Sequence, residues 1–349
     1  MVSSGGMRIQ RVDLADADLM RACRAVQVAA HDMDDPDGDP PLSLALFSSL
    51  MTRTWNCDPV EAWYVPADEL GGVGQDIPVA AICRLAMQDL ENRGRAFVNP
   101  IVHPAFRRRG IGRALLRHAA QRAEAAGRAN LDGVVVQGSA GAAFAQKLGA
   151  TPGIVDARRI LDLRKVQASR FAKLRAEAAE HAKGYSLVSW TGRTPEDELG
   201  RVAGVMNAMN DAPREEGLFE DDIWDADRVR DRGDMQVRFA GNRAYSIAAV
   251  HDATGEMAAL TQLFVDPADP GWGRQGLTGV TRPHRGHRLG LLTKAAMLEW
   301  VATAEPQLEH IETNNAAVNS YMISVNEALG FELCEPNFQF YALPTAQVS

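Results

Sequence analysis

Residues 98–116 read VNPIVHPAFRRRGIGRALL, and this stretch decides the fold. Its first part is typical of a β-strand that ends at a proline, and the part after Gly110 has the 3.6-residue period of an amphipathic helix. Glycines at a strand-to-helix turn let backbone N–H groups approach a phosphate closely, and the helix N-terminus adds about half a positive charge. The stretch therefore predicts a diphosphate-binding turn. By itself the pattern is weak, because any tight turn with a solvated arginine patch looks similar.

A second copy of this pattern, TGVTRPHRGHRLGLLTKAAMLEW, occupies residues 278–300. The matched positions are Arg285, Leu289 and Gly290 for Arg107, Ile111 and Gly112. One position differs, because Arg288 stands where the first copy has Gly110. Its side chain either blocks the diphosphate or binds it, and we favour binding because Gly286 and Gly290 still free the backbone.

Strand-like and helical segments follow one another in the same order in both halves, about 175 residues apart. This spacing indicates a duplicated domain and not a solenoid, whose repeats are of order 20–50 residues. We expect an α/β protein with two domains, each a mixed, mostly antiparallel twisted sheet flanked by helices. The expected boundaries are 1–165 and 185–349, joined by a solvated helical linker over 166–184 that is rich in Ala, Arg, Glu and Lys.

Composition excludes several function classes. The chain carries 45 acidic against 37 basic residues, a formal charge of -8, so a nucleic-acid partner is not expected. The four cysteines are far apart and the histidines lack metal-ligand spacing, so no metal is expected. An apolar run of the roughly 20 residues that a bilayer requires is absent from the sequence, which predicts a cytoplasmic protein without a membrane partner.

The two turns resemble the pyrophosphate loop of the GNAT superfamily of acyl-CoA-dependent N-acetyltransferases, R/Q-x-x-G-x-G/A after a strand. Residues 319–331, NSYMISVNEALGF, resemble the superfamily's last motif, N-x-x-A-x-x-x-Y-E-x-x-G-F. Two ordered matches at the right separation are more specific than either loop alone. The likeness covers both halves and is to tandem GNAT proteins, such as mycothiol synthase and acetyltransferases of antibiotic clusters, the clavulanic acid pathway included.

The resemblance implies an acyl-CoA donor, acetyl-CoA or another, as co-substrate and in one domain as a structural ligand. It implies direct attack by the amine of a small molecule in a ternary complex, in a monomer or homodimer. The residues expected to bind the donor are Ile101, Val102, Arg107, Arg108, Arg109, Gly110, Ile111 and Gly112 in the first half, and Val280, Arg285, Gly286, Arg288, Leu289, Gly290 and Asn319 in the second.

Departures from the family pattern predict which half turns over. In the first half, Gly138 and Ala145 stand where the family has its pantetheine-contacting Asn and its thiolate-protonating Tyr. The second half keeps Asn319 but has Asn326 at the Tyr position. We therefore expect the first domain to bind acyl-CoA without catalysis and the second to carry acyl transfer.

The catalytic candidates are Tyr321 and Tyr341 as acids and Glu312, at the end of a strand, as a base. Tyr and Asn near helix starts are more often capping or packing residues. His284 and His287 either contact phosphate or are merely solvated. A rival class, a non-catalytic acyl-CoA-binding or scaffold protein, predicts the same donor binding without product.

Overall fold

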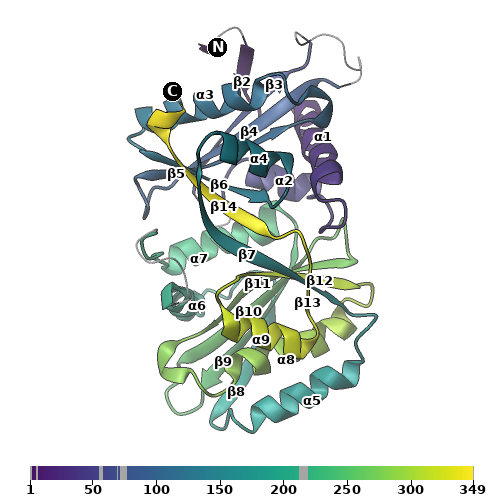
Figure 1. Ribbon diagram of the computed structural model, residues 1–349. Coiled ribbons are helices and arrows are strands. Elements are labelled where there is room, and N and C mark those ends of the chain that lie inside the picture. Colours follow the sequence, from purple (N-terminus) through teal and green to yellow (C-terminus); the bar gives the residue numbers. More distant parts are fainter. Residues whose placement is uncertain are drawn as a thin grey trace. The chain divides into compact units, whose positions relative to one another are not determined.

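The computed structural model describes residues 2–4, 7–54, 58–68, 70, 77–211 and 219–348. It divides into two compact units (Figure 1). Unit 1 comprises Met1–Val155 and Pro336–Ser349, and unit 2 comprises Asp156–Glu335. None of the helices among the described residues combines the length and hydropathy needed to span a membrane.

The sheet of unit 1 runs in the order β1-β2-β3-β4-β5-β6-β14, and all neighbours are antiparallel except β5 and β6. Its strands are β1 (Val2–Ser4), β2 (Met7–Arg11), β3 (Val60–Pro66), β4 (Val79–Met87), β5 (Arg95–Val102), β6 (Asn130–Val136) and β14 (Phe338–Pro344). Its helices are α1 (Ala17–Asp34), α2 (Leu44–Leu50), η1 (Pro104–Phe106), α3 (Ile111–Ala125), α4 (Ala140–Lys147) and η5 (Thr345–Gln347).

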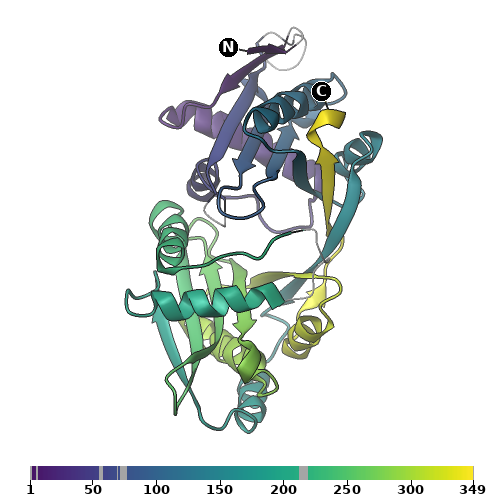
Figure 2. The ribbon, with the colours of Figure 1, turned by 90° about the vertical axis from the view of Figure 1, so that its left-hand side faces the viewer.

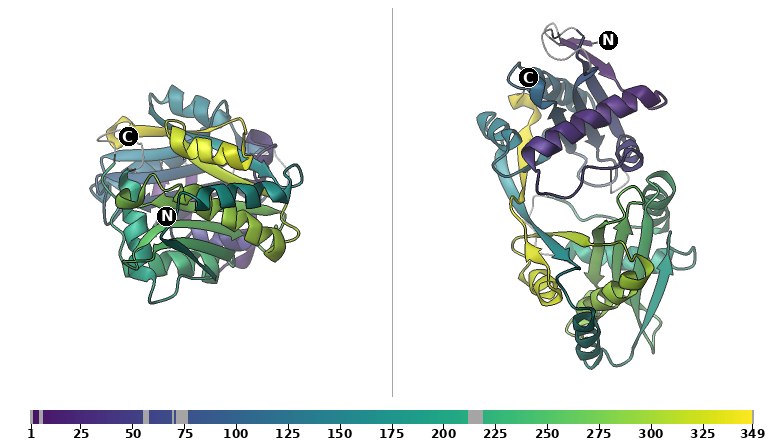
Figure 3. Two further views of the ribbon diagram at one scale, coloured as in Figure 1. Left: turned by 90° about the horizontal axis from the view of Figure 1, so that it is seen from below. Right: turned by 90° about the vertical axis from the view of Figure 1, so that its right-hand side faces the viewer.

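Helices cover both faces of this sheet, and each face has its own apolar core. On one face α1 packs with α2 through buried side chains such as Met20 and Phe47, which contact Ile82 of β4. On the other face α3 buries Leu115 against Leu85 of the same strand. Alternation along β4 sends neighbouring side chains to opposite faces, which explains why the strand is apolar almost throughout. Figure 3 shows α1 lying across the sheet.

The sheet of unit 2 runs β7-β12-β11-β10-β9-β8, with β13 also paired to β7. Its strands are β7 (Thr151–Asp162), which begins in unit 1, β8 (Tyr185–Thr191), β9 (Arg243–His251), β10 (Met257–Val265), β11 (Trp272–Val280), β12 (His310–Ala316) and β13 (Glu332–Leu333). Its helices are α5 (Ala168–Ala179), α6 (Leu199–Asn207), η2 (Ala208–Asp211), α7 (Ala226–Gly233), η3 (Asp234–Phe239), η4 (Arg282–His284), α8 (Leu289–Ala304) and α9 (Ser320–Leu329).

Helices α6 and α7 cover one face of this second sheet, and α8 with α9 covers the other (Figure 2). Leu260 of β10 contributes to the core under α6, whereas Leu263 of the same strand contributes to the core under α8. The segment η3 is a π-helix that continues directly from α7.

Each sheet opens at its single parallel pair of strands. In unit 1, β5 and β6 pair from Arg95 with Asn130 as far as Phe97 with Asp132. In unit 2, β11 and β12 pair only from Trp272–His310 to Arg274–Glu312. Beyond these residues β5 and β11 keep their antiparallel partner on the other side. The C-terminal half of each strand therefore presents backbone N–H and C=O groups to an opening in its sheet.

The two halves of the sequence exchange their last strands. After α4, residues Asp156–Asp162 of β7 pair with β12 of unit 2 and not with β6. The place beside β6 is taken by β14, which follows the last helix of the second half. The continuous domains 1–165 and 185–349 expected from the sequence therefore differ from the observed units by one strand each.

The predicted fold class is confirmed, since both sheets are mixed, mostly antiparallel and flanked by helices. The expected linker over 166–184 differs from the structure. Its helix, α5, buries Phe171 in the core of unit 2 and Ala178 in a second cluster with Leu292 of α8. A few buried residues in a polar, Ala-rich helix suffice for packing, and composition alone conceals them.

Candidate functional site

The first strand-to-helix turn adopts a backbone conformation with two left-handed residues. Arg108 has φ of 66° and Gly110 has φ of 84°, and α3 begins at the next residue without a side-chain cap. The first N–H groups of α3 therefore stay available to an anion. Ile111 is buried beneath the turn and Gly112 is half-buried, and a Cβ atom at Gly112 would lie 3.7 Å from the Val102 side chain.

The second turn has the same conformation with the residue types reversed. Here Gly286 has φ of 90° and Arg288 has φ of 54°, and α8 again starts without a side-chain cap. Each turn thus places one glycine and one arginine at its two left-handed positions. Because the Arg288 side chain is exposed, it does not fill the turn. The second turn therefore keeps a left-handed backbone at this position with Arg288, as the first turn does with Gly110.

We call β5 and β11 the open strands, because their C-terminal halves border the openings in the sheets. The first arginine of each turn connects the open strand of its unit to a helix. Arg107 donates to the carbonyl of Val102 at 3.1 Å and to both carboxylate oxygens of Asp34 at 2.6 and 2.7 Å. We expected this guanidinium to face a diphosphate, but the structure directs it toward the protein. It therefore positions the turn, whereas Arg108 and Arg109 are the exposed cations there.

Arg285 makes the equivalent contacts in unit 2. It donates to the carbonyl of Val280 at 3.3 Å and to Asp211 at 3.2 Å. Hydrogen bonds from Arg282, with the charges of both arginines, hold the pKa of the Asp211 carboxyl below its usual value. This arginine too positions its turn, with Leu289 and Gly290 buried behind it.

The residue that precedes these arginines differs between the units. In unit 1 it is Phe106, which is buried in the apolar core under α3. In unit 2 it is His284, whose ring nitrogens lie 2.8 Å from the Tyr185 hydroxyl and 3.2 Å from the Glu256 carboxylate. The expectation that His284 is solvated is wrong, because its ring is buried. His287 lies in the turn, with its ring 5.3 Å from that of Tyr185.

The open strands differ in the register of their backbone. In unit 1, β4 and β5 pair without interruption, and Pro100 lies opposite Cys83. In unit 2, the pairing of β10 with β11 shifts between Thr261 and Leu263, so that Gln262 faces the two residues Gly276 and Leu277. This is a β-bulge, and it leaves an extra residue outside the regular ladder.

The bulge is held by side chains. The Gln275 amide donates to the Gln262 carbonyl at 2.5 Å and to the Thr261 hydroxyl at 3.1 Å. Gly276 is required here because a Cβ atom would lie 2.6 Å from the Phe264 ring. These residues were not predicted from the sequence, where their only signal is that β11 has one residue more than β5 between its parallel start and its end.

Donors on the open edges follow from the alternation of strand N–H groups. His103 donates to Ala80 of β4, so the nitrogens of Pro100 and Val102 point the other way, toward the opening. Thr281 donates to Ala258 of β10, and Thr278 N–H therefore points toward the opening of unit 2. At this matched position unit 2 has a donor, whereas the proline of unit 1 has none.

A carboxylate stands at the end of the parallel pair in each unit. Glu312 is buried on β12, and its Oε1 accepts from the Asn314 amide at 2.7 Å. Its pairing with Arg274 places it on the face of the sheet that carries Phe264, toward α6 and α7. The matched residue of unit 1, Asp132, receives two hydrogen bonds from Arg95.

The remaining candidates are not brought together. Asn319 caps α9 by accepting from Met322 N–H at 3.2 Å, which is the capping role, and Ser139, not Gly138, caps α4. Tyr321 is exposed at the start of α9. Tyr341 lies on β14 in unit 1, where its hydroxyl is 3.4 Å from the Gln146 amide.

This position corrects the expectation that Tyr341 serves the second domain, since the strand exchange carries it into the first. Asn326 is fully buried and donates to Asn315 at 2.7 Å. An amide in that position is a packing and hydrogen-bonding residue without useful acidity. The Ala145 and Asn326 positions therefore provide no acid in either unit.

A possible cation site lies near the end of α1, next to Asp34, although none was expected. The ligand atoms of His31, Asp35 and Asp39 lie within 4.8 Å of one another near the end of α1. Acidic groups often gather near a surface without an ion, so we assign no metal to them.

The comparisons with known proteins agree with this geometry. Residues 65–149 match the family model described as an acetyltransferase (GNAT) domain. A mycothiol acetyltransferase of Gordonia bronchialis is 29% identical over 239 residues, which cover 68% of this chain and 70% of the relative.

Among solved structures, a tandem GNAT protein from the clavulanic acid biosynthesis pathway aligns with a TM-score of 0.77 and 29% identity over 97% of this chain and 98% of its own. A GCN5-related N-acetyltransferase from Sphaerobacter thermophilus aligns with a TM-score of 0.61 at 14% identity, over 99% and 97% of the two chains, and supports the fold alone. The family match over residues 65–149 and the likeness of the whole chain to a tandem GNAT structure together indicate the fold of GNAT acetyltransferases. Each unit of this chain is similar to one such fold.

Proposed function

We propose that the chain transfers an acyl group from acyl-CoA to the amine of a small molecule, and that unit 2 carries the turnover. The donor's diphosphate would be bound by the free N–H groups at the start of α8, with Arg288 as the exposed cation of the turn. The open edge of β11 would receive the pantetheine arm, because unpaired strand groups are suited to an amide-containing chain. Both features are present in unit 1 as well, so they support donor binding in each unit.

The observation that favours unit 2 for catalysis is the pair Thr278 and Pro100. A thioester carbonyl under attack develops negative charge on oxygen, and a fixed N–H donor stabilises it. Thr278 N–H points into the opening beside the β-bulge, whereas Pro100 at the same position of unit 1 has no N–H. Only unit 2 therefore has this donor at this position.

The proton balance assigns a role to Glu312. The amine nitrogen attacks the thioester carbon, the C–S bond breaks and the thiolate leaves, while the nitrogen must lose a proton. Glu312 lies on the adjacent strand and on the face of the sheet opposite α8, so we propose that it accepts this proton through water. A thiol has a pKa near 8.5, so the thiolate leaves without a protein acid and takes its proton from solvent.

Unit 1 is proposed as a holding site for acyl-CoA. Its turn is complete, but its open strand has a proline at the position where unit 2 has the N–H donor of Thr278. Binding without turnover follows from these features.

Substitution of Thr278 tests the proposal. Thr278→Pro removes the N–H, and kcat for thiol release in the presence of an amine panel should fall by roughly 10²–10³-fold, the range for one oxyanion donor. Thr278→Val keeps the N–H and removes only the hydroxyl that lies 2.8 Å from Thr261, so it should retain most of the activity. Acyl-CoA binding, counted by native mass spectrometry, shows that the site is intact. Full turnover in Thr278→Pro would contradict the assignment.

A further inference from the structure

A cluster of titratable side chains surrounds Tyr185 beside the second turn. Tyr185 begins β8, His251 ends β9, Glu256 lies just before β10, and His284 ends η4. The ring of His251 lies 5.2 Å from that of Tyr185 and 5.3 Å from that of His284. His287, between the two left-handed residues of the turn, lies with its ring 5.3 Å from that of Tyr185. The cluster therefore joins the ends of β8 and β9 to the segment proposed to bind the diphosphate.

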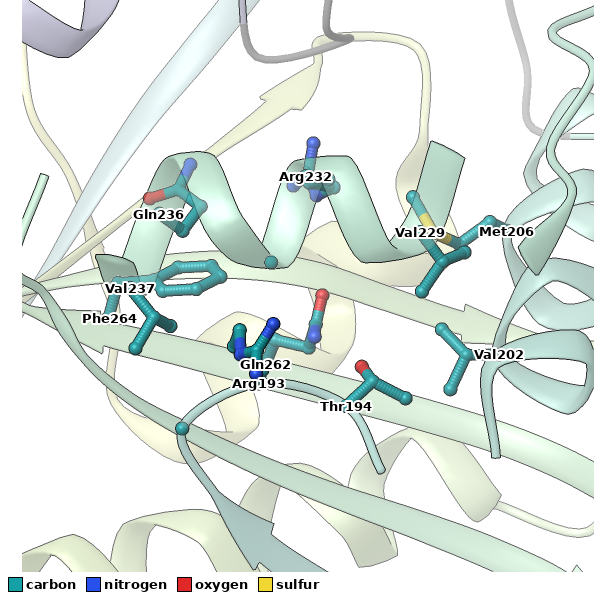
Figure 4. Close-up of a pocket in the computed structure, with 12 residues that line it drawn as sticks. Arg193, Thr194, Val202, Met206, Val229, Arg232, Gln236, Val237, Gln262 and Phe264 are labelled. Atoms are coloured by element: carbon teal, nitrogen blue, oxygen red, sulfur yellow. The ribbon is translucent and has the colours of Figure 1, made fainter. Parts of the chain in front are cut away.

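This cluster is separate from the pocket that unit 2 has between β10 and α7–η3 (Figure 4). The pocket has room for about one water molecule once open solvent is left out. Gln262 and Phe264 of β10 line it, and its described lining residues include no histidine. We assign no ligand to this pocket, and the histidines of the cluster belong to the donor turn.

His284 can take up a proton without losing either of its hydrogen bonds. Its Nε2 lies 3.2 Å from the Glu256 carboxylate, which only accepts, so Nε2 carries a proton in both charge states of the ring. In the neutral ring Nδ1 accepts from the Tyr185 hydroxyl at 2.8 Å, and in the charged ring Nδ1 donates to the same oxygen. Burial raises the pKa of Tyr185, so its hydroxyl stays neutral and serves in both directions. The site therefore accommodates a neutral or a charged ring.

The charges around this ring favour a proton that arrives together with an anion. The carboxylate in contact with the ring, Glu256, is 66% exposed and therefore partly screened by solvent. On the other side lies His251, whose own charged form would repel a second charge. Two further cations of the segment, Arg282 and Arg285, are directed to Asp211. A diphosphate at the turn would add the negative charge that favours the charged ring.

Unit 1 has a different arrangement at the matched positions. Phe106 stands at the position of His284 and cannot titrate. The histidine of that segment, His103, accepts at Nδ1 from Ala105 N–H at 3.2 Å, and a proton on Nδ1 would break this bond. Burial and the charge of Arg107 also lower the pKa of His103. Its ring therefore stays neutral, whereas the ring of His284 can become charged.

We propose that acyl-CoA binding in unit 2 is coupled to proton uptake by His284, and that the charged ring strengthens diphosphate binding at the second turn. His284 is a positioning residue, since its ring bonds to Tyr185 and Glu256 and not to the donor. Donor affinity in unit 2 falls as the pH rises through the range near 6.5 where histidine titrates, because binding takes up a proton. This inference rests on the donor binding proposed for unit 2 and adds its regulation by pH.

Isothermal titration with acetyl-CoA in phosphate and in Tris, whose ionisation enthalpies differ, measures the protons taken up on binding. The wild type should take up roughly half a proton more than His284→Gln near pH 7, the scale for one histidine whose titration moves by one pKa unit. Glutamine keeps an acceptor for Tyr185 and a donor for Glu256, so it removes only the charge. The phosphates of CoA contribute equally to both proteins. His310→Gln, at the start of β12 and away from the turn, is the matched control and should leave the uptake unchanged.

Equal proton uptake by the wild type and His284→Gln overturns the inference and leaves donor binding in place. Loss of the uptake in His287→Gln or His103→Gln, with His284→Gln unchanged, gives the proton to another ring and also overturns it. Absence of acetyl-CoA binding in the wild type overturns the proposed function together with this inference. Should His284→Gln fail to fold, Glu256→Gln is the second variant. Without that carboxylate a charged ring is less favoured, so the uptake should move to lower pH, and an unchanged uptake contradicts the inference.

Discussion

Unit 1 and unit 2 use the same backbone turn with different residues. Both turns have two left-handed positions, but one has Arg108 and Gly110 there and the other has Gly286 and Arg288. In contrast, the open strands differ in the backbone itself, because only β11 has a bulge. The comparison shows that duplication preserved the geometry proposed to bind the donor and changed the strand where we place the chemistry. Variants that make one unit resemble the other test this directly.

The largest effect is expected at the two matched carboxylates. Glu312→Gln should lower kcat for acyl transfer by about 10²–10⁴-fold, the range for a general base, with the donor KM little changed. Asp132→Asn should leave kcat unchanged, because unit 1 is proposed to bind acyl-CoA without turnover. Steady-state thiol release checks both, and the Tm shows that each variant is folded. Loss of activity in Asp132→Asn alone would reverse the roles of the units.

A large effect on stability is expected at Lys294, which occupies in α8 the position of Leu116 in α3. It is fully buried, its Nζ has no hydrogen-bond partner in the described part of the chain, and burial lowers its pKa from 10.5 to about 7. Between these two pKa values the unfolded chain binds more protons than the folded one, so stability rises with pH across this range. Lys294→Leu should therefore stabilise the protein by about 2–5 kcal/mol at pH 7, at 1.36 kcal/mol per pKa unit.

The gain from Lys294→Leu should shrink as the pH rises toward 10, because deprotonation in the unfolded state removes the difference. Denaturant unfolding at pH 7 and pH 9.5 measures it. Lys173→Leu, at a lysine whose side chain is 77% exposed, is the control and should show no such pH-dependent gain. A constant gain at both pH values would mean that Lys294 has the same pKa in the folded and unfolded chains, and would contradict this prediction.

A smaller effect is expected from substitutions at Gly110. A Cβ atom there meets no atom within 4 Å, so the cost comes from the left-handed backbone, about 1–2 kcal/mol for an ordinary residue. Gly110→Arg copies Arg288 and should weaken acyl-CoA binding in unit 1 by less than 10-fold, whereas the β-branched Gly110→Val should weaken it more. Native mass spectrometry with acyl-CoA resolves the two sites. Equal acyl-CoA binding by both variants would contradict the idea that the cost at Gly110 comes from its left-handed backbone.

The smallest effects are expected at the carboxylates behind the turns. Asp34→Asn removes the two-pronged bond to Arg107, whose side chain is 20% exposed, and should lower acyl-CoA affinity in unit 1 a few-fold. Asp211→Asn should have less effect in unit 2, because Arg285 is 43% exposed and such pairs contribute up to about 1 kcal/mol. Isothermal titration of each variant measures the ratio, and a larger loss in Asp211→Asn would refute this ranking.

Local patterns predicted the two turns, because hydrophobic period, glycine and proline act within a few residues. The strand exchange could not be read from the sequence, since β7 and β14 occupy interchangeable positions in two copies of one fold. The bulge at Gly276 depends on which residues face each other across strands, and Arg107 depends on Asp34, 73 residues away. The candidate base Glu312 was identified because a charge at a strand end is a local signal.

The exchanged strand has a consequence for synthesis. A ribosome releases the chain from its N-terminus, and domains generally fold in that order. Unit 1 cannot complete its sheet until residues 338–344 of β14 have left the ribosome, long after its other strands. Until then the edge of β6 is exposed, and such an edge is a template for pairing with another chain. Unit 1 is therefore synthesised first but completes its sheet last, and the nascent chain needs β14, from the second half of the sequence, to cover the exposed edge of β6.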